Sequence, residues 1–498
     1  MYCRDHLIFL LRLHHETSMI INLNNQKGLL SLTVLIFGTI AIIMLSGLVI
    51  WADAGLKASY RVTDRALAFR IAEAGIEYYR WHLGQAPNDF QDGTGQPGPY
   101  VHNFYDRNGV LIGTFTLEIT SPSPGSSVAT IKSIGKVQID PSVEKIIEAK
   151  MAKPSFANYA VIVNDNVRFG EGTEVFGPIH SNGGIRFDGL AHNVVTSALE
   201  DYKDPDHSGN DEFGVHTHLS PADPLPPNPV PLRTDVFEAG REFPVPVIDF
   251  AGITDDLTSI KSAAQASGRY FGPSEEEGYH LVFKTNDTFD LYKITEIVDL
   301  PNGCIEVLGQ QDWGSWSIET EQLLGNYTFP VDGNIFFEDH VWVDGQINTA
   351  RVVVGAGVFP ENSAKYAHIL VNKDLLYTNY DGQDAIGLVA QGNMSVGWVS
   401  EDDLRIDAAL FAQNWRVGRF YYRPPSGNQN RCAPHHIKTT FTSYGMIASN
   451  QRYGFSYTDG TGYLNRNLIY DANLLYAPPP SFPLTEGSYD QISWTEEK

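Results

Sequence analysis

The sequence has few cysteines and little positive charge, and both shortages argue against whole classes of protein. Its three cysteines, Cys3, Cys304 and Cys432, form no CxxC pair, so neither a disulfide-rich scaffold nor a cysteine-built zinc site is available. Lysine and arginine number 35 against 59 acidic residues, and a net charge of −24 repels phosphate backbones. The GxSxG, HExxH and P-loop motifs are absent. We therefore expect no nucleic-acid partner, no enzymatic activity and no cofactor.

Turn-forming residues are abundant by contrast. The chain carries 45 glycines and 28 prolines, which indicates many short elements and favours β structure over a helical bundle. Hydrophobic residues make up 42% and aromatic residues 12% of the sequence, enough for most of it to fold around a core.

One long apolar run stands near the N-terminus. Residues 29–52 read LLSLTVLIFGTIAIIMLSGLVIWA without a charge, and about 20 apolar residues suffice for a helix to span a bilayer. Arg4, Arg12 and Lys27 precede the run and Asp53 follows it. The sequence therefore predicts a single membrane span with its N-terminus in the cytoplasm and the rest of the chain outside.

Two simpler interpretations of this run stay open. Ala52-Asp53-Ala54 has the small-residue pattern of a signal-peptide cleavage site, although signal-peptide cores of about 7–15 residues are shorter than this run. The run could also be a plain membrane anchor without any processing.

The predicted helix continues beyond the apolar run. No proline occurs between Asp53 and Leu83, and helix-forming residues dominate. Apolar or small residues recur every three or four positions, which predicts one buried stripe on an amphipathic second half. The predicted stripe consists of Leu56, Tyr60, Thr63, Leu67, Ile71, Ala74 and Tyr78.

Two local motifs give this helix a family resemblance. Lys27-Gly28 stands directly before the apolar run, and Ala72-Glu73-Ala74-Gly75-Ile76-Glu77 lies in the second half. Together they resemble the N-terminal domain of PilX-type minor pilins and of K-type pseudopilins of type II secretion. The resemblance covers about residues 19–83. It implies cleavage between Gly28 and Leu29 by a prepilin peptidase, N-methylation of Leu29, and packing against other pilins or pseudopilins through the helix.

One position departs from the family pattern. Major pilins carry glutamate at the fifth mature position, where it pairs with a neighbouring subunit's N-terminal amine, and here that position is Thr33. Because this chain cannot form that pair, the resemblance favours a minor or tip subunit. Met19 lies ten residues before Leu29, so a shorter leader beginning at Met19 is also possible.

Short β runs follow the helix. Alternating residues at 113–119 and 129–134, and less regularly at 145–151, predict a small antiparallel sheet packed on the helix. Further along, Asn164–Gly170 is echoed eighteen residues later by Asn182–Asp188. Repeats of this length built from short β runs are typical of solenoid rungs. We predict a right-handed parallel β-helix head, with a β-sandwich as the alternative.

These patterns divide the chain into seven parts. The head is expected to carry a small α+β insertion, and a proline-rich segment is expected to form an extended connector. The predicted parts are a leader (1–28), the membrane and amphipathic helix (29–86), the small sheet (87–153), the first rungs (154–200), the connector (201–249), the insertion (250–331), and the main rungs with a C-terminal cap (332–498).

Candidate ligand and redox residues are sparse. Asp204, Asp206, Asp211 and Glu212 have the character of a calcium loop, but Val215 stands where an EF-hand needs a carboxylate, so we expect no metal there. His216-Thr217-His218, and His435-His436 with Cys432, offer incomplete transition-metal sets. Cys304 and Cys432 are candidates for a disulfide outside the cytoplasm.

The sequence as a whole indicates a structural protein. It predicts a membrane-anchored, prepilin-like component of a type IV pilus (fimbrium) or related secretion system, whose head serves in cell adhesion or filament initiation and contacts a surface glycan or a host or neighbouring cell. Parallel β-helices also occur in carbohydrate-active proteins, for which Asp402, Asp403 and Asp407 are the nearest candidates. A tethered carbohydrate-binding or carbohydrate-active head, or a self-assembling β-helix scaffold, therefore remains an alternative.

Overall fold

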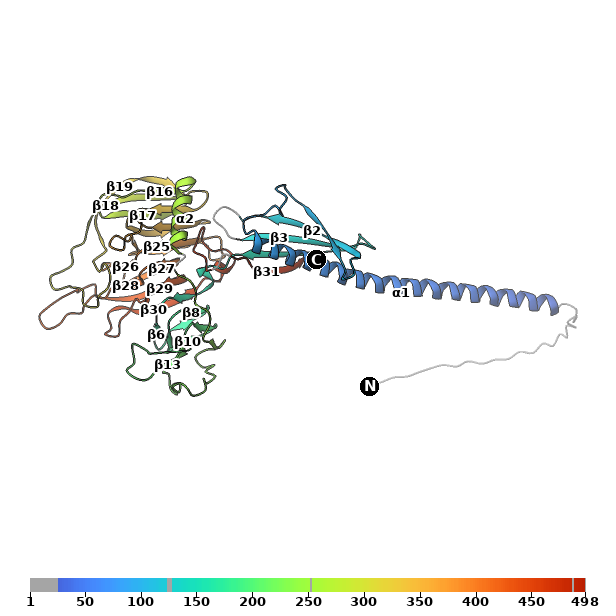
Figure 1. Ribbon diagram of the computed structural model, residues 1–498, viewed down its shortest axis with the longest axis horizontal. Helices are drawn as coiled ribbons and strands as arrows, with labels where there is room; N and C mark the ends of the chain where they lie inside the picture. The colour runs from blue at the N-terminus through green and yellow to red at the C-terminus, as the bar shows by residue number, and fades with distance from the viewer. Residues whose placement is uncertain (1–25, 123–127, 251–252, 486–487, 498) are drawn as a thin grey trace, which may run out of the picture.

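The computed structural model describes residues 26–122, 128–250, 253–485 and 488–497. The protein is mainly β with one long N-terminal helix, as the sequence predicts. Helix α1 (Gln26–Gln85) projects from a small sheet, and a large β head lies at the other end of the molecule (Figure 1). Residues 1–25 of the predicted leader lie outside the described residues.

The small sheet is antiparallel and packs on the second half of α1. Its strands run in the order β1-β2-β3-β4-β31, and β2, β3 and β4 coincide with the three predicted strands. The last strand differs from the prediction that all of residues 332–498 belong to the head, because β31 pairs with the free edge of β4. The bounds are β1 (Tyr100–Tyr105), β2 (Leu111–Thr120), β3 (Ala129–Val137), β4 (Glu144–Ala152) and β31 (Asp490–Glu497).

The head is a stack of parallel rungs, as predicted. The eighteen-residue echo corresponds to two adjacent rungs, since β6 pairs in parallel with β9 and places Val167 beside Ile185 and Phe169 beside Phe187. The two phenylalanine rings stack at 4.7 Å inside the solenoid. The first rungs comprise β5 (Val161–Val163), β6 (Val167–Phe169), β7 (Glu174–Val175), β8 (Ile179–Ser181), β9 (Ile185–Phe187), β10 (Leu190–Ala191) and β11 (Val195–Ser197).

The main rungs return to the point where the chain first enters the stack. The longest of their strands, β29, lies parallel to β5, with Ile447 opposite Val161. A ladder of asparagines crosses this junction, because the Asn164 side chain bonds Asn450 on one side (2.7 Å) and Asn182 on the other (2.6 Å). The main rungs comprise β20 (Asn334–Phe337), β21 (Val341–Gln346), β22 (Arg351–Ala356), β23 (Ile369–Leu370), β24 (Leu375–Leu376), β25 (Ala385–Ala390), β26 (Met394–Val396), β27 (Asp403–Ala412), β28 (Val417–Arg419), β29 (Ile437–Ser449) and β30 (Gly462–Tyr470).

The predicted α+β segment, residues 250–331, contains α2 and several strands, and part of it joins the end of this stack. Strands β16 (Arg269–Phe271) and β17 (Gly278–Lys284) pair in parallel with β20 and β21. Leu281 and Phe283 are buried in the solenoid core, which explains why this segment joins the stack. Strands β18 (Thr288–Ile297) and β19 (Ile318–Thr328) extend it as an antiparallel pair, and α2 (Ile253–Ala266) packs on β16, β20 and β22 (Figure 1).

The proline-rich connector 201–249 contains no helix, as predicted, but it is more structured than expected. Strand β14 (Val215–His216) pairs in parallel with β9, and β15 (Arg241–Glu242) pairs with β11. Strands β12 (Asp201–Tyr202) and β13 (Glu212–Phe213) form a short antiparallel pair. The connector therefore covers the far end of the first rungs (Figure 1).

Apolar residues of the head pack in two layers. The larger cluster fills the inside of the solenoid. The second lies outside, where Leu257 and Ile260 of α2, and Leu474 and Phe482 near the C-terminus, cover side chains such as Phe336. Both surfaces of the strands beneath this cover are thereby removed from water.

Two chain segments join the head to the small sheet. One follows β4 into the head, and the other leaves the head before β31. They pair in an antiparallel bridge between Ser155 and Leu484. Backbone hydrogen bonds from Thr485 to Pro154 (2.9 Å) and from Phe156 to Pro483 (3.2 Å) flank that bridge. We call residues 153–156 and 483–485 the neck.

Candidate functional site

The first half of α1 is a bare apolar rod. Its most apolar window has a mean hydropathy of 2.5, and none of that window is buried. This helix is long and apolar enough to span a membrane, by length and composition. A contiguous apolar surface of this size requires lipid or other helices to cover it.

Hydroxyl groups along this rod are satisfied within the helix. Thr33 donates to the Leu29 carbonyl (2.8 Å), and Ser46 donates to the Ile42 carbonyl (2.7 Å). Such bonds remove the hydroxyls from competition for outside partners. Thr33, at the predicted fifth mature position, therefore uses its hydroxyl internally.

The second half of α1 packs closely on β3 through small residues of the family motif. A Cβ at Gly75 would lie 2.2 Å from Ser133 Oγ. Opposite the helix, a Cβ at Gly135 would lie 2.1 Å from the Ala68 carbonyl oxygen and 2.5 Å from the Ala72 nitrogen. Backbone approach of this kind requires glycine. The alanine and glycine positions of the motif thus allow contact between helix and sheet.

The acidic positions of the motif face away from the sheet. Glu73 and Glu77 are exposed, and Glu77 pairs with Arg80 at 2.8 Å on the helix surface. Ala74 is half-buried. The two carboxylates are therefore available to other molecules.

The predicted stripe on α1 is buried only in part, since Ile71 is buried whereas Thr63 is exposed. Leu56 and Tyr60 are exposed, and Leu67, Ala74 and Tyr78 are only half-buried. Because Ala68, Ala72 and Gly75 are small, the helix backbone can lie against the sheet, and the face of α1 that carries them is the buried one. The buried residues are Ala68, Ile71, Ala72, Gly75, Ile76, Tyr79 and Leu83.

The predicted processing site lies at the start of the described helix. The backbone of Lys27 and Gly28 is helical, and Leu29 is 71% exposed. Cleavage between Gly28 and Leu29, and methylation of Leu29, stay predictions.

The four calcium candidates do not converge on one point. Asp206 pairs with Arg452 at 2.6 Å, and Asp211 is exposed. Asp204 and Glu212 are buried and lie instead among histidines. The predicted oxygen-only set is therefore replaced by a mixed group.

This group, which we call the His–carboxylate cluster, consists of Asp204, His207, Glu212, His216 and His218. His216 Nε2 lies 3.7 Å from Asp204 Oδ2, and His218 Nε2 lies 3.3 Å from Glu212 Oε1. His207 Nδ1 lies 3.2 Å from the same Glu212 oxygen. Burial lowers the pKa of His216, which favours its neutral imidazole.

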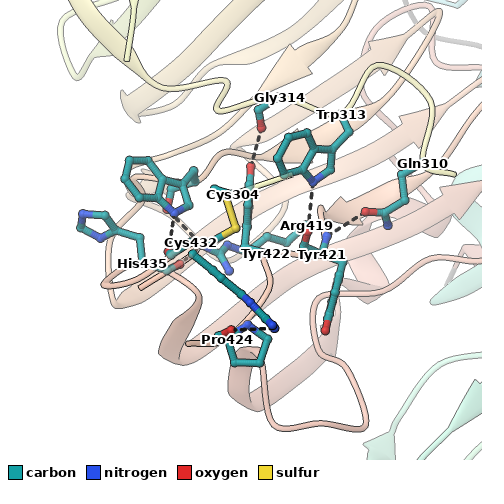
Figure 2. Close-up of a disulfide and its surroundings, with 12 residues drawn as sticks. Cys304, Gln310, Trp313, Gly314, Arg419, Tyr421, Tyr422, Pro424, Cys432 and His435 are labelled. Carbon is teal, nitrogen blue, oxygen red and sulfur yellow. Dashed lines mark hydrogen bonds between the residues drawn. A yellow bond between two sulfur atoms is a disulfide. The ribbon is translucent and has the colours of Figure 1, made fainter. Parts of the chain in front are cut away.

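Cys304 and Cys432 form a disulfide in the structure. It joins the β18–β19 connection to the segment after β28, and Figure 2 shows the aromatic residues around it. Trp313 donates to the Tyr421 carbonyl (3.0 Å), and Tyr422 donates to the Gly314 carbonyl (2.8 Å) across the same junction. Cys432 is thereby unavailable to form a thiolate ligand set with His435 and His436.

Replacing both Cys304 and Cys432 with serine is expected to destabilise this junction by about 2–4 kcal/mol, because the bond closes a loop spanning 128 residues. Limited proteolysis of the full chain should then cut within residues 299–317 at lower protease concentration. Reduced wild-type protein should match the variant, and Cys3→Ser serves as the matched substitution. Equal protease resistance in oxidised wild type and double variant would contradict a stabilising role.

The carboxylates predicted for a carbohydrate-active head are not assembled as a pair. Asp402 bonds Lys438 at 2.8 Å, and Asp403 is exposed at the start of β27. Asp407 is fully buried and accepts hydrogen bonds from Arg405 (2.8 Å) and Tyr380 (2.7 Å). These contacts indicate structural roles.

An acidic groove between β17, β19 and β21 was not foreseen. It encloses about 430 Å³ and is lined by His280, Glu321, Trp342, Asp344 and Glu401 among others. His280 bridges Glu321 (2.7 Å) and Asp344 (2.9 Å). Burial opposes a charged imidazole, but these two hydrogen bonds outweigh it and raise the pKa of His280. Burial, with the charge of Asp374, raises the pKa of Glu401. The residues that line the groove come from segments far apart in the sequence, so no local motif marks it.

Comparisons with known proteins find similarity among solved structures. No protein-family model and no curated protein matches this sequence. Among solved structures, the crystal structure of the competence-associated pilin ComZ from Thermus thermophilus is 13% identical. The match covers 87% of this chain and 98% of that chain, at a TM-score of 0.28. A TM-score of this size does not establish a shared fold, and no function follows from it.

Proposed function

We propose that this chain is a membrane-inserted, prepilin-like subunit of a type IV pilus or related secretion system. The observation that carries the proposal is helix α1 itself, which spans Gln26–Gln85 without interruption. Its first half is apolar and uncovered, while its second half is fixed to a sheet. One continuous helix of this kind suits storage in lipid followed by packing among other helices.

The motifs support the finer parts of the proposal. Lys27-Gly28 would be recognised by a prepilin peptidase, which would leave Leu29 as a methylated N-terminus. Thr33 lacks the carboxylate of a major subunit, and this favours a minor or tip position. The N-terminus would face the cytoplasm, and the head would lie outside, in adhesion or filament initiation.

The head is the part that would meet a ligand. The acidic groove is a concave surface with polar side chains, as binding sites commonly have. A surface glycan or a component of a neighbouring cell would be its partner under this proposal.

The proposal is tested on protein recovered from membranes and from sheared filaments. Mass spectrometry should find Leu29 at the N-terminus with one added methyl group. A photo-crosslinker at Ile36, 47% exposed on the apolar rod, should join the helix to other subunits. The same probe at Val331, which is 100% exposed on the head, is the matched control and should not reach those helices.

A freely secreted mature protein that lacks residues 29–52 would overturn the proposal. Equal crosslinking from Ile36 and Val331 would also contradict specific packing of the rod.

A further inference from the structure

The His–carboxylate cluster contains two buried polar atoms that lack a hydrogen bond. Asp204 Oδ2 and His216 Nε2 have no hydrogen-bond partner among the described residues. His216 is 0% exposed and Asp204 is 4% exposed. Leaving such groups unpaired in the interior is costly, so each one requires an explanation.

The two atoms face each other at a distance unsuited to a direct bond. They lie 3.7 Å apart, which is beyond the range of a hydrogen bond. Ligand atoms held about 2.0–2.1 Å from a tetrahedral ion stand roughly 3.4 Å from one another. Asp204, His216 and His218 each offer one ligand atom, and the three atoms lie within 4.8 Å of one another. Small side-chain movements would therefore bring them around one ion.

Neighbouring groups orient these side chains in the manner of an outer ligand shell. The His216 Nδ1 lies 3.3 Å from the Phe213 carbonyl oxygen, and a proton donated there leaves Nε2 with its lone pair. The other Asp204 oxygen, Oδ1, accepts from the Asp206 backbone (2.9 Å). The His218 backbone donates to Asp188 (2.8 Å). Asp204 and His216 are thus each fixed by a bond that does not use the inward atom, whereas His218 Nε2 lies 3.3 Å from Glu212 Oε1.

The charges around the cluster suit a cation. Arg186 Nη1 lies 3.6 Å from Asp204 Oδ2, but the Arg186 Nε is bonded to Asp188 at 2.7 Å. Glu212 is 2% exposed and adds a second carboxylate next to His218. Arg452 is engaged by Asp206. Arg186 shares Asp188 with Arg168 (3.7 Å), so the three arginines here face four carboxylates, those of Asp188, Asp204, Asp206 and Glu212.

We propose that Asp204, His216 and His218 bind a divalent transition-metal ion of the zinc class, with Glu212 beside them as a further carboxylate. Imidazole nitrogens combined with a carboxylate select zinc-class ions, whereas calcium prefers an oxygen-only shell. The ion would tie two segments of the connector to each other, because Asp204 follows β12 while His216 lies in β14, the strand that pairs with β9. This inference does not depend on the pilin proposal.

The test uses the full chain in detergent, purified through a tag without histidine and stripped of metal with a chelator. Titration with Zn²⁺ should give one bound ion per chain by elemental analysis. Co²⁺ should give visible absorption bands with the intensity of a low-coordinate site. Asp204→Asn and His218→Gln should each weaken Zn²⁺ binding by more than about 100-fold, beyond the cost of typical outer-shell changes.

Matched substitutions separate ligands from neighbours. His192→Gln is the remote control, because His192 bonds Glu238 (2.8 Å) outside the cluster, and it should bind Zn²⁺ as the wild type does. His207→Gln changes a cluster histidine that is not a proposed ligand. It should alter the affinity for Zn²⁺ by less than about threefold, which is smaller than the typical effect of losing an outer-shell partner. Circular dichroism of each variant shows whether it is folded. His216→Gln is a further ligand variant. If it does not fold, His218→Gln still tests a proposed ligand, because His218 is only partly buried.

Three results would overturn the proposal. One is the absence of stoichiometric Zn²⁺ or Co²⁺ binding by the folded wild type. Another is binding that survives both Asp204→Asn and His218→Gln. The third is binding of Ca²⁺ alone.

Discussion

A chain carrying Gly28→Glu is expected to remain in the membrane as an uncleaved precursor. The resemblance to prepilins places the cut directly after Gly28, and a charged side chain there would change the residue next to the scissile bond. Wild-type protein should begin at Leu29, whereas the variant should retain Lys27 and the residues before it. Intact-mass measurement of the membrane fraction distinguishes the two, and the expected loss of processing is close to complete.

Gly38→Ala is the matched control for this substitution. Gly38 lies in the same helix with nothing within 4 Å of its potential Cβ, so the change should leave cleavage unaffected. Normal release of Leu29 from the Gly28→Glu chain would show that residues 1–28 are not a prepilin leader.

Gly135→Val is expected to separate α1 from its sheet. A Cβ there meets the Ala68 carbonyl oxygen at 2.1 Å and the Ala72 nitrogen at 2.5 Å, and neither backbone atom can rotate away. Overpacking of this kind costs about 3 kcal/mol or more. Hydrogen exchange of the β3 amides should therefore accelerate about 100-fold, while the head remains protected.

Two further substitutions make this result specific. Gly84→Ala, in the same helix with nothing within 4 Å, should be neutral or slightly stabilising. Gly75→Ala should destabilise through the 2.2 Å contact with Ser133 Oγ, and adding Ser133→Ala should restore part of the loss. Unchanged exchange in Gly135→Val would mean that close contact between helix and sheet is not required.

Local patterns in the sequence were enough to predict α1 and the repeating rungs. Helix periodicity and the absence of proline act over a few residues, and residues eighteen apart become neighbours on adjacent rungs. Apolar spacing correctly places Ile71 on the buried face of α1. It does not single out Ala68, Ala72 and Gly75, whose small size lets the helix approach the sheet. Hydrophobicity does not record how closely two backbones approach.

Long-range pairing could not be predicted in the same way. Asn164 and Asn450 are 286 positions apart, and nothing in the sequence marks them as partners. Similarly, β31 completes the small sheet only because β4 leaves an edge unpaired. Pairing of this kind is determined by which edges remain free once the rest of the chain has folded.

The sequence contains the residues of the candidate cluster but does not show that they come together. His216-x-His218 and the acidic residues before it are two separate patterns. Alternate positions in an extended segment face the same way, so the two histidines are expected on one side. Their combination required the antiparallel turn of β12 and β13, which brings Asp204 and Glu212 to the histidines. The oxygen-rich spacing alone does not indicate that histidines join the two buried carboxylates.

The neck has a mechanical consequence. The head is tethered by two antiparallel segments that hydrogen-bond to each other and continue into neighbouring strands, β4 and β31. A pulling force on the head would load both strands together, and their hydrogen bonds would have to yield in concert. The two segments together would also resist twisting of the head relative to the small sheet, which a single connecting segment could not do. If the proposed function holds, such a double tether would keep the head in one orientation while α1 is pulled.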